Sequence, residues 1–186
     1  MCCHAFVINL KKEGIITSIN IKQINIIDSD CECIVNAANS GLLAGGGVCG
    51  SVFSAAGYME LTRACDAIGH CDVGSAVITD GFKLSKYIIH AVGPKYNDGN
   101  HGESDYLYSC YKSCLDLTIK HNIKSIAFPL ISAGIYHYPA KEAIEVAINS
   151  CTDWQKENNY EIDIVFAILD INKYQYANEY LKQISE

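Results

Sequence analysis

The chain alternates short runs rich in Ile and Val with longer segments of helical periodicity, and this alternation restricts its fold more than any other feature. The apolar runs have the length of buried strands, while Gly, Asn, Asp or Pro marks the ends of the longer segments. Strands covered by helices on both faces are mostly parallel. The sequence therefore predicts an α/β protein, a three-layer α/β/α sandwich around a mixed, largely parallel central sheet.

The predicted elements follow one another without a linker or an internal repeat. The predicted strands are Ala5–Asn9, Ile15–Asn20, Cys33–Asn36, Ser75–Thr79, Tyr87–Val92, Ser125–Pro129 and Asp163–Ala167. The predicted helices are Val48–Ala56, Met59–Ala67, Ser104–His121, Ala140–Asn158 and Lys173–Ser185. Lys95–Glu103, "KYNDGNHGE", is a polar surface loop by composition. With 186 residues, 49% of them hydrophobic, one domain spanning 1–186 is expected.

Charge and composition restrict the partners. The net charge of −7, without a block of Lys or Arg, argues against a long nucleic acid, although backbone N–H groups suffice to hold one nucleotide. No apolar run approaches the roughly 18 residues of a membrane span and no export signal is seen, so a cytoplasmic protein with no membrane partner is expected. The ten cysteines are scattered through the predicted elements, which favours free thiols over a disulfide scaffold.

A glycine turn follows one of the apolar runs in the stretch "IVNAANSGLLAGGGVCG", Ile34 to Gly50. Without a Cβ, Gly45, Gly46 and Gly47 allow the backbone to lie against a ligand, and the predicted helix that follows suits an anion at its N-terminus. The alternative is a turn without a ligand. Neither G-x-x-x-x-G-K-[ST] nor a convincing G-x-G-x-x-G occurs, so an ATPase or a Rossmann dehydrogenase is not supported.

A second stretch, "SIAFPLISAGIYHYP", again leads from a buried strand through a loop of small residues, Ser132 to Gly134, towards a helix. Ligands of open α/β sheets bind beyond the carboxyl ends of the strands. Two phosphate-sized loops on one sheet therefore predict a diphosphate ligand.

These stretches, together with "CDVGSAVITDGFKLSKYIIHAVGP" and "CYKSCLDL", resemble the macro domains, a family that binds ADP-ribose. The four blocks occur in the order and spacing of that family. The resemblance implies that residues 1–186 form a single macro domain. We expect a monomer without a metal or a cofactor. It implies ADP-ribose and mono-ADP-ribosylated proteins as its partners.

The resemblance also implies roles for residues of both loops. Asn39 would hydrogen-bond the distal ribose, and backbone N–H groups would stabilise the reacting phosphate region, so Asn39 and Gly47 are the candidate catalytic residues. Asn36 is instead available to cap its own loop. The implied ligand-binding residues are Asn25, Ile26, Ala38, Asn39, Gly45, Gly46, Gly47, Val48, Cys49, Ser132, Ala133, Gly134, Ile135 and Tyr136.

The sequence departs from the family pattern at three positions. Cys49 stands where many hydrolytic members have Asp, and it is either a small pocket residue or a nucleophile at a helix N-terminus. Asn25 replaces the Asp that accepts from the adenine amino group, with Asp28 as a substitute if the loop is shorter and a surface turn as the alternative for either. His137 stands where Gly is common, and a positive φ there would suit His poorly.

Other polar residues have ordinary explanations. His90 lies within an apolar run and reads as a core histidine, and Cys110 and Cys114 as small core residues on one helix. One of Tyr136 and Tyr138 is expected to cover the sugar while the other packs inward. Two further groups of possible ligands lack the spacing of a structural zinc site: Cys65, His70 and Cys71, and Cys2, Cys3 and His4.

The function expected from these observations is hydrolysis of the ester bond between ADP-ribose and an acidic side chain, or of O-acetyl-ADP-ribose. A water molecule bound against the substrate's phosphate would attack. Two alternatives use the same pocket: a reader module without turnover, and an ADP-ribose-1''-phosphate phosphatase.

Overall fold

The computed structural model describes residues 7–12 and 15–185, and these form a seven-stranded sheet of order β1-β2-β7-β6-β3-β5-β4. The five strands from β2 to β5 in this order pair in parallel, while β1 and β4 pair antiparallel at the two edges. The strands are β1 Val7–Lys12, β2 Ile15–Lys22, β3 Cys33–Ala37, β4 Ala76–Asp80, β5 Tyr87–Ala91, β6 Ser125–Phe128 and β7 Asp163–Ala167.

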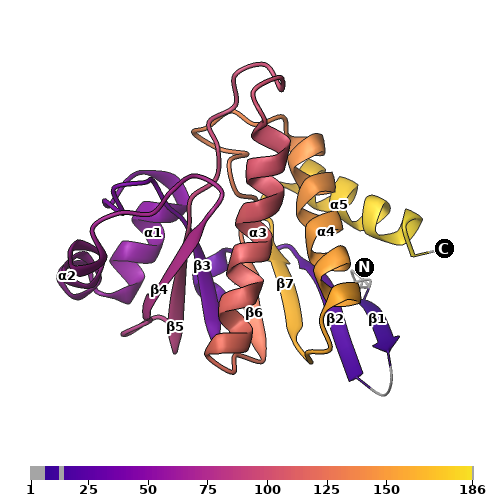
Figure 1. The fold of residues 1–186 in the computed structure, drawn as a ribbon, viewed down its shortest axis with the longest axis horizontal. Helices are drawn as coiled ribbons and strands as arrows, with labels where there is room; N and C mark the ends of the chain where they lie inside the picture. The colour runs from indigo at the N-terminus through magenta and orange to yellow at the C-terminus, as the bar shows by residue number, and fades with distance from the viewer. Residues whose placement is uncertain (1–6, 13–14, 186) are drawn as a thin grey trace.

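Helices pack on both faces of this sheet, with α1 and α2 beside β3 to β5, and α3 and α4 crossing in front of the central strands (Figure 1). The helices are η1 Ile26–Asp28, which is a 3₁₀ turn, α1 Gly47–Ala56, α2 Tyr58–Ile68, α3 Glu103–Lys120, α4 Ala140–Glu157 and α5 Ile171–Gln183. The arrangement is the three-layer α/β/α sandwich that the alternation of elements predicted, so that prediction is confirmed.

The central strands alternate between two hydrophobic cores. Ile34 of β3 and Ile88 of β5 belong to the core under α1 and α2, while their neighbours Val35 and Ile89 belong to the core under α3, α4 and α5. All four side chains are fully buried, as expected for parallel strands that are covered on both faces. This is why the runs are continuously apolar and not alternating.

The predicted element boundaries are correct to within a few residues. The first predicted strand, Ala5–Asn9, begins outside the described residues, and its described part lies in β1. Ser75 precedes β4, Ile171 begins α5 two residues earlier than predicted, and the turn η1 was not predicted. A three-residue 3₁₀ turn has no hydrophobic period by which a sequence could reveal it.

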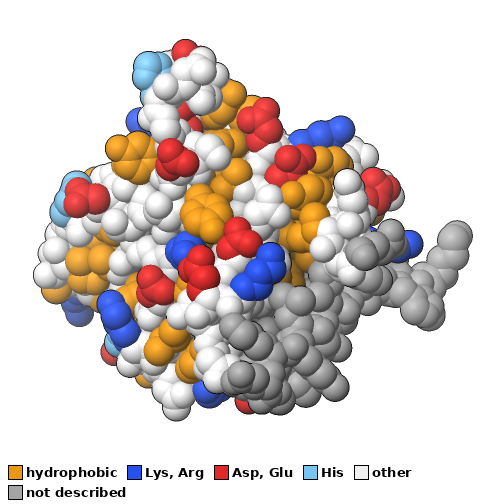
Figure 2. Space-filling model, turned by 45° about the vertical axis from the view of Figure 1, so that its right-hand side comes forward, with side chains coloured by type: hydrophobic (Ala, Val, Ile, Leu, Met, Phe, Trp, Pro, Cys, Tyr) orange, Lys and Arg blue, Asp and Glu red, His pale blue; other side chains and the backbone are white. Residues whose placement is uncertain are grey.

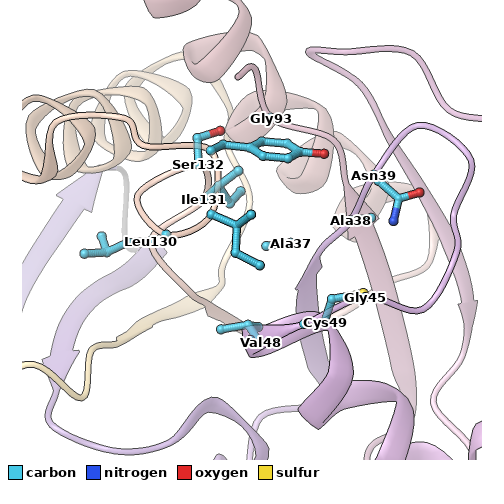
Figure 3. Close-up of a pocket in the computed structure, with 15 residues that line it drawn as sticks. Ala37, Ala38, Asn39, Gly45, Val48, Cys49, Gly93, Leu130, Ile131 and Ser132 are labelled. Carbon is cyan, nitrogen blue, oxygen red and sulfur yellow. The ribbon is translucent and has the colours of Figure 1, made fainter. Parts of the chain in front are cut away.

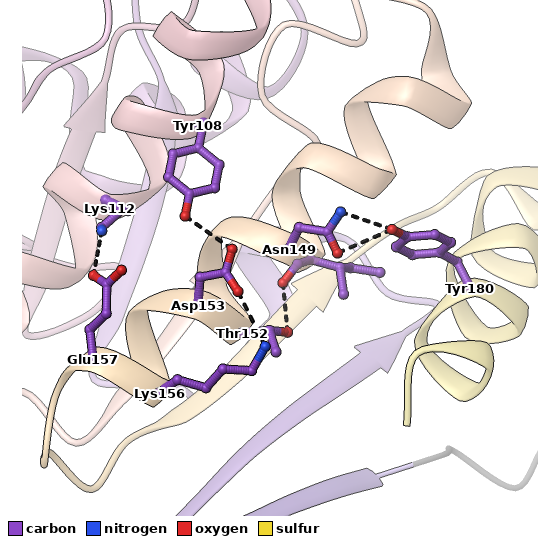
Figure 4. A network of polar contacts seen from close by, with 9 residues as sticks. Tyr108, Lys112, Asn149, Thr152, Asp153, Lys156, Glu157 and Tyr180 are labelled. Atoms are coloured by element: carbon purple, nitrogen blue, oxygen red, sulfur yellow. Dashed lines mark hydrogen bonds and ion pairs between the residues drawn. The ribbon is translucent and has the colours of Figure 1, made fainter. Parts of the chain in front are cut away.

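Polar contacts between α3, α4 and α5 tie these helices together on their outer side (Figure 4). Tyr108 donates to Asp153 at 3.1 Å, and both amide atoms of Asn149 bond to the hydroxyl of Tyr180, at 2.8 and 3.1 Å. Acidic and basic side chains are interspersed on the face shown in Figure 2. Among residues 7–12 and 15–185, no helix combines the length and the apolar character needed to cross a bilayer.

Candidate functional site

A cavity of about 350 Å³ lies where the chain leaves the carboxyl ends of β3, β5 and β6 (Figure 3). The chain continues from β3 to α1 on one face of the sheet and from β6 to α4 on the other, so the cavity lies where the sheet topology switches direction. The cavity is lined by Ala37, Ala38, Asn39, Gly45, Gly46, Gly47, Val48, Cys49, Gly93, Leu130, Ile131, Ser132, Gly134, Ile135 and Tyr136.

The predicted glycine turn forms one wall of this cavity and leads directly into α1. Gly47 has φ +60°, a left-handed conformation that favours glycine, and Gly46 caps the helix without a side-chain hydrogen bond. A Cβ on Gly50 would lie 2.6 Å from the carbonyl oxygen of Gly45. Gly50 therefore lets α1 close tightly against the turn, and the positive end of α1 is directed towards the cavity.

The second loop, residues 130–136, forms the opposite wall, and the sequence predicted its residues 132–136. Ser132 has φ +64° and is 6% exposed, and its hydroxyl has no hydrogen-bond partner among the described residues. His137 has φ +57°, which is the conformation in which a glycine would be favoured at this position. Left-handed backbone conformations thus lie at both ends of residues 132–137, and the buried hydroxyl of Ser132 is left without a partner among the described residues.

Gly93 lies between the two walls and was not among the predicted site residues. A Cβ at this position would lie 2.3 Å from Oγ of Ser132 and 2.5 Å from Cγ2 of Ile131. The second loop can pack against the chain after β5 only because Gly93 has no side chain. A glycine directly after the predicted strand Tyr87–Val92 is the only hint that the sequence offers of this role. The residues that Gly93 contacts, Ile131 and Ser132, are distant in the sequence, so the contact could not be predicted. Ala37, Leu130 and Ile131 also line the cavity without having been predicted.

Asn39 lies at the rim of the cavity, as Figure 3 shows, and both atoms of its amide bond to one residue of the following loop. Its Nδ2 donates to the carbonyl oxygen of Leu43 at 2.7 Å, and its Oδ1 accepts from the N–H of Leu43 at 3.1 Å. These bonds orient the side chain before any ligand arrives. One N–H and one lone pair of the amide remain for a ligand.

Asn36 is buried behind the cavity in a chain of hydrogen bonds. Its Nδ2 donates to Nδ1 of His90 at 3.1 Å, and Nε2 of His90 in turn lies 3.0 Å from Oγ1 of Thr79. Burial lowers the pKa of His90 to about 4, so the ring is neutral at pH 7. His90 is the satisfied core histidine that the sequence predicted, and Asn36 bonds to that histidine and not to its own loop.

The comparison with known proteins places this geometry in a family. The family model described as Macro domain matches residues 35–147 of the chain, which include the glycine turn, Gly93 and the second loop. The chain belongs to the macro domain family. The resemblance that the sequence motifs indicated is thereby confirmed.

Proteins and structures across bacteria and animals are similar to this macro domain. A macro domain-containing protein of Listeria monocytogenes is 47% identical over 143 residues, which are 75% of this chain and 81% of that protein. The human ADP-ribose glycohydrolase MACROD2 is 41% identical over 162 residues, which are 84% of this chain and 37% of MACROD2. The structure of a mutant Oceanobacillus iheyensis macrodomain with ADPR superposes with a TM-score of 0.88 at 31% identity, covering 97% of this chain and 98% of that one.

In this macro domain Cys49 occupies the wall between the glycine turn and Asn36. Its side chain lines the cavity but is only 6% exposed, and its Sγ lies 3.7 Å from the carbonyl oxygen of Leu43 and 3.7 Å from Nδ2 of Asn36. No charged side chain is among these contacts. Every cysteine of the described residues is a free thiol, and burial raises the pKa of both Cys65 and Cys71 to about 11.

Three residues that the resemblance assigned to the ligand do not line the cavity. Asn25 caps η1, its Oδ1 accepting from the N–H of Ile27 at 3.4 Å, and Ile26 is 3% exposed. The carbonyl oxygen of Ala133 accepts from Nζ of Lys173 at 3.3 Å. A shallow depression adjoins the cavity at Gly47 and is lined further by Ile27, Gly50, Ser51, Ser54 and Ala55.

The two tyrosines that flank His137 have different environments. Tyr138 is 4% exposed and packs edge-on against Tyr96, with 4.9 Å between ring centroids. Tyr136 lines the cavity. The structure thus decides a choice that the sequence left open, and Tyr136 is the one available to cover a ligand.

The described residues bring no three His, Cys, Asp or Glu side chains together at a distance suitable for a metal. Cys65 instead lies 3.7 Å from Nε2 of His90, and His70 bonds to Asp72 at 3.0 Å. Cys2, Cys3 and His4 lie outside the described residues.

Proposed function

We propose that this macro domain binds ADP-ribose in the cavity and hydrolyses the ester that links ADP-ribose to acidic side chains of modified proteins. The observation that carries the proposal is the opposition of two walls suited to phosphate. One is the glycine turn at the N-terminus of α1, and the other bears the unpartnered hydroxyl of Ser132. The similarity of the chain to the ADP-ribose glycohydrolase MACROD2 and to the macrodomain structure with ADPR supports the choice of ligand.

The side chains of the cavity restrict the mechanism. Asn39, Cys49, Ser132 and Tyr136 are the residues with polar side-chain groups among those that line it, and none of them is a carboxylate, an imidazole or an amine. A general base of the protein is therefore missing from the lining, and a substrate phosphate oxygen would take the proton of the attacking water. Positioning and backbone N–H groups then supply the catalysis.

In the proposed reaction a water oxygen forms a bond to the anomeric carbon of the distal ribose. The bond from that carbon to the ester oxygen breaks, and the side-chain carboxylate leaves with the electron pair. Asn39 holds the ribose, and the N–H groups of the turn that includes Gly47 stabilise the charge of the diphosphate. No electron acceptor is needed, since the step is a hydrolysis.

A reader without turnover is the second candidate, because the lining lacks an acid or a base. To test these two functions, the protein is incubated with a protein that carries labelled ADP-ribose on Asp or Glu. Release and retention of the label are both followed. We expect release. A label that stays on the substrate while the complex forms would identify a reader. A second assay with ADP-ribose-1''-phosphate would identify a phosphatase if phosphate were released there and no label were released from the modified protein.

The Cys49→Ala variant should keep at least about a tenth of the rate of ADP-ribose release, because no proton transfer worth the usual 10² to 10⁴-fold is removed. The structure supports a bystander role, since Cys49 is nearly buried and contacts no base. Cys49→Asp should leave the rate equal or higher, by restoring an acceptor beside the ribose. Single-turnover release by the three proteins is the measurement. A rate lost in Cys49→Ala with ADP-ribose affinity retained would make the thiol the nucleophile.

A further inference from the structure

The polar loop between β5 and α3, which projects at the top of Figure 1, is organised around one buried carboxylate. Glu103 is the first residue of α3 and is 3% exposed. Its Oε1 and Oε2 accept backbone hydrogen bonds from Asn97 at 3.2 Å, Asp98 at 3.4 Å, Gly99 at 3.3 Å and His101 at 2.7 Å. A segment that reads as a loose surface loop is thus folded around an acceptor at its own end.

The backbone N–H groups keep this carboxylate ionised. Desolvation opposes its charge, but hydrogen bonds from the backbone of Glu103, His101, Asn97 and Gly99 outweigh it and lower the pKa of Glu103 to about 2. Charge-assisted bonds of this kind are about twice as strong as neutral ones. The loop therefore has a defined conformation at neutral pH. Among the described residues, Glu103 forms no ion pair with a basic side chain.

This loop contacts the second wall of the cavity. The N–H of Tyr96 donates to the carbonyl oxygen of Tyr136 at 2.9 Å, and Nζ of Lys95 lies 5.6 Å from the centroid of the Tyr136 ring. The ring of Tyr96 packs against Tyr138, two residues further along. Residues of the loop around Glu103 thereby contact the cavity-lining residue Tyr136 directly and hold Tyr138, which follows it in the chain.

The second wall needs such support because its backbone is strained. Ser132 and His137 adopt left-handed conformations that cost a non-glycine residue on the order of 1 kcal/mol each, and these persist only where the surroundings hold them. Within the wall, the N–H of Tyr138 donates to the carbonyl oxygen of Ser132 at 3.0 Å and the N–H of His137 to that of Gly134 at 2.9 Å. Ala133 donates to the carbonyl oxygen of Leu130 at 3.4 Å and accepts from Lys173. The bond from His137 to Gly134 closes a turn that includes Tyr136, but none of these bonds is made to an atom of Tyr136 itself, whose carbonyl oxygen accepts from Tyr96.

We propose that Glu103 is a positioning residue of the cavity: it folds the loop that bears Lys95 and Tyr96, and this loop holds Tyr136 in place for the ligand. The assignment of ADP-ribose as that ligand rests on the proposed function. The coupling between the two loops does not, because the bonds that carry it are present without a ligand.

Glu103→Gln tests the proposal, because the amide nitrogen of Gln cannot accept the N–H groups that one carboxylate oxygen accepts. We expect a folded protein with about tenfold weaker ADP-ribose affinity by calorimetry. Hydrogen exchange should rise in residues 95–102 and also in residues 133–137. Glu142→Gln is the matched control, since Glu142 is exposed and its charge also acts on Tyr96 and Tyr138. It should change neither exchange nor affinity.

Two further variants test the proposal if Glu103→Gln does not fold. Glu103→Asp keeps the charge, and should keep more of the affinity than Glu103→Gln does. Gly99→Ala leaves Glu103 intact but puts a side chain at φ +82°, with its Cβ 3.1 Å from the hydroxyl of Tyr96, and should raise exchange in both loops. Faster exchange in 95–102 alone, with 133–137 and affinity unchanged, would overturn the positioning role. If the wild type binds no ADP-ribose, the proposed function fails while the exchange coupling still decides the role of Glu103.

Discussion

Asn39→Ala is expected to lower the rate of ADP-ribose release by about 10²-fold, the scale of losing a contact that positions a reacting group. The structure gives two reasons for a loss this large. The amide at the rim of the cavity is removed, and so are its two bonds to Leu43, which orient the loop between Asn39 and the glycine turn. Single-turnover release from a glutamate-linked substrate measures the effect, with the fold checked by thermal unfolding.

Asn149→Ala is the matched control for this prediction. Asn149 also uses both amide atoms, in its case on the hydroxyl of Tyr180 between α4 and α5, as Figure 4 shows. Its loss should cost about 1 kcal/mol of the free energy of unfolding and leave release unchanged. If Asn39→Ala released ADP-ribose as fast as this control, Asn39 would have no part in the mechanism.

Gly93→Ala is expected to lower the free energy of unfolding by about 2 kcal/mol, the middle of the range for overpacking a buried site. The new methyl group would overlap Ser132 and Ile131, at 2.3 and 2.5 Å, and would push the second wall into the cavity. ADP-ribose affinity should fall at least about tenfold as a result. Urea denaturation gives the first quantity and calorimetry the second.

Gly134→Ala separates this overlap from any general effect of replacing glycine. A Cβ on Gly134 would meet no atom within 4 Å, so its stability should change by less than about 0.5 kcal/mol. Equal destabilisation by the two substitutions would show that the contacts of Gly93 do not explain its effect.

The fold and the two loops were readable because their signals are local. Strand length, helical period and the residues at element ends lie within a few positions of one another, as in the runs that became β3 and β6. The glycine turn at Gly45 to Gly47 carries its own conformational requirement, which the φ of +60° at Gly47 bears out. The motifs in "IVNAANSGLLAGGGVCG" and "SIAFPLISAGIYHYP" also indicated the macro domain family, which the match over residues 35–147 confirms.

The environment of individual side chains depends on partners that are distant in sequence, and there the sequence was insufficient. Nothing near Gly93 shows that Ser132 will lie against it, and nothing near Asn36 shows that its amide will meet His90. Composition predicted a polar surface loop before α3. The burial of the Glu103 carboxylate could not be predicted from the residues next to it in the sequence.

The sequence by itself determined the α/β/α architecture, the family and the two loops that form the walls of the cavity, since each is a property of contiguous residues. Only the tertiary structure decided that Tyr136 lines the cavity while Tyr138 is buried against Tyr96, and that the buried Glu103 accepts hydrogen bonds from the backbone of the loop between β5 and α3. The reason is physical. Secondary structure follows from short-range sterics and periodic burial, whereas the hydrogen bonds and contacts that orient a site form only when the packed sheet brings distant segments together.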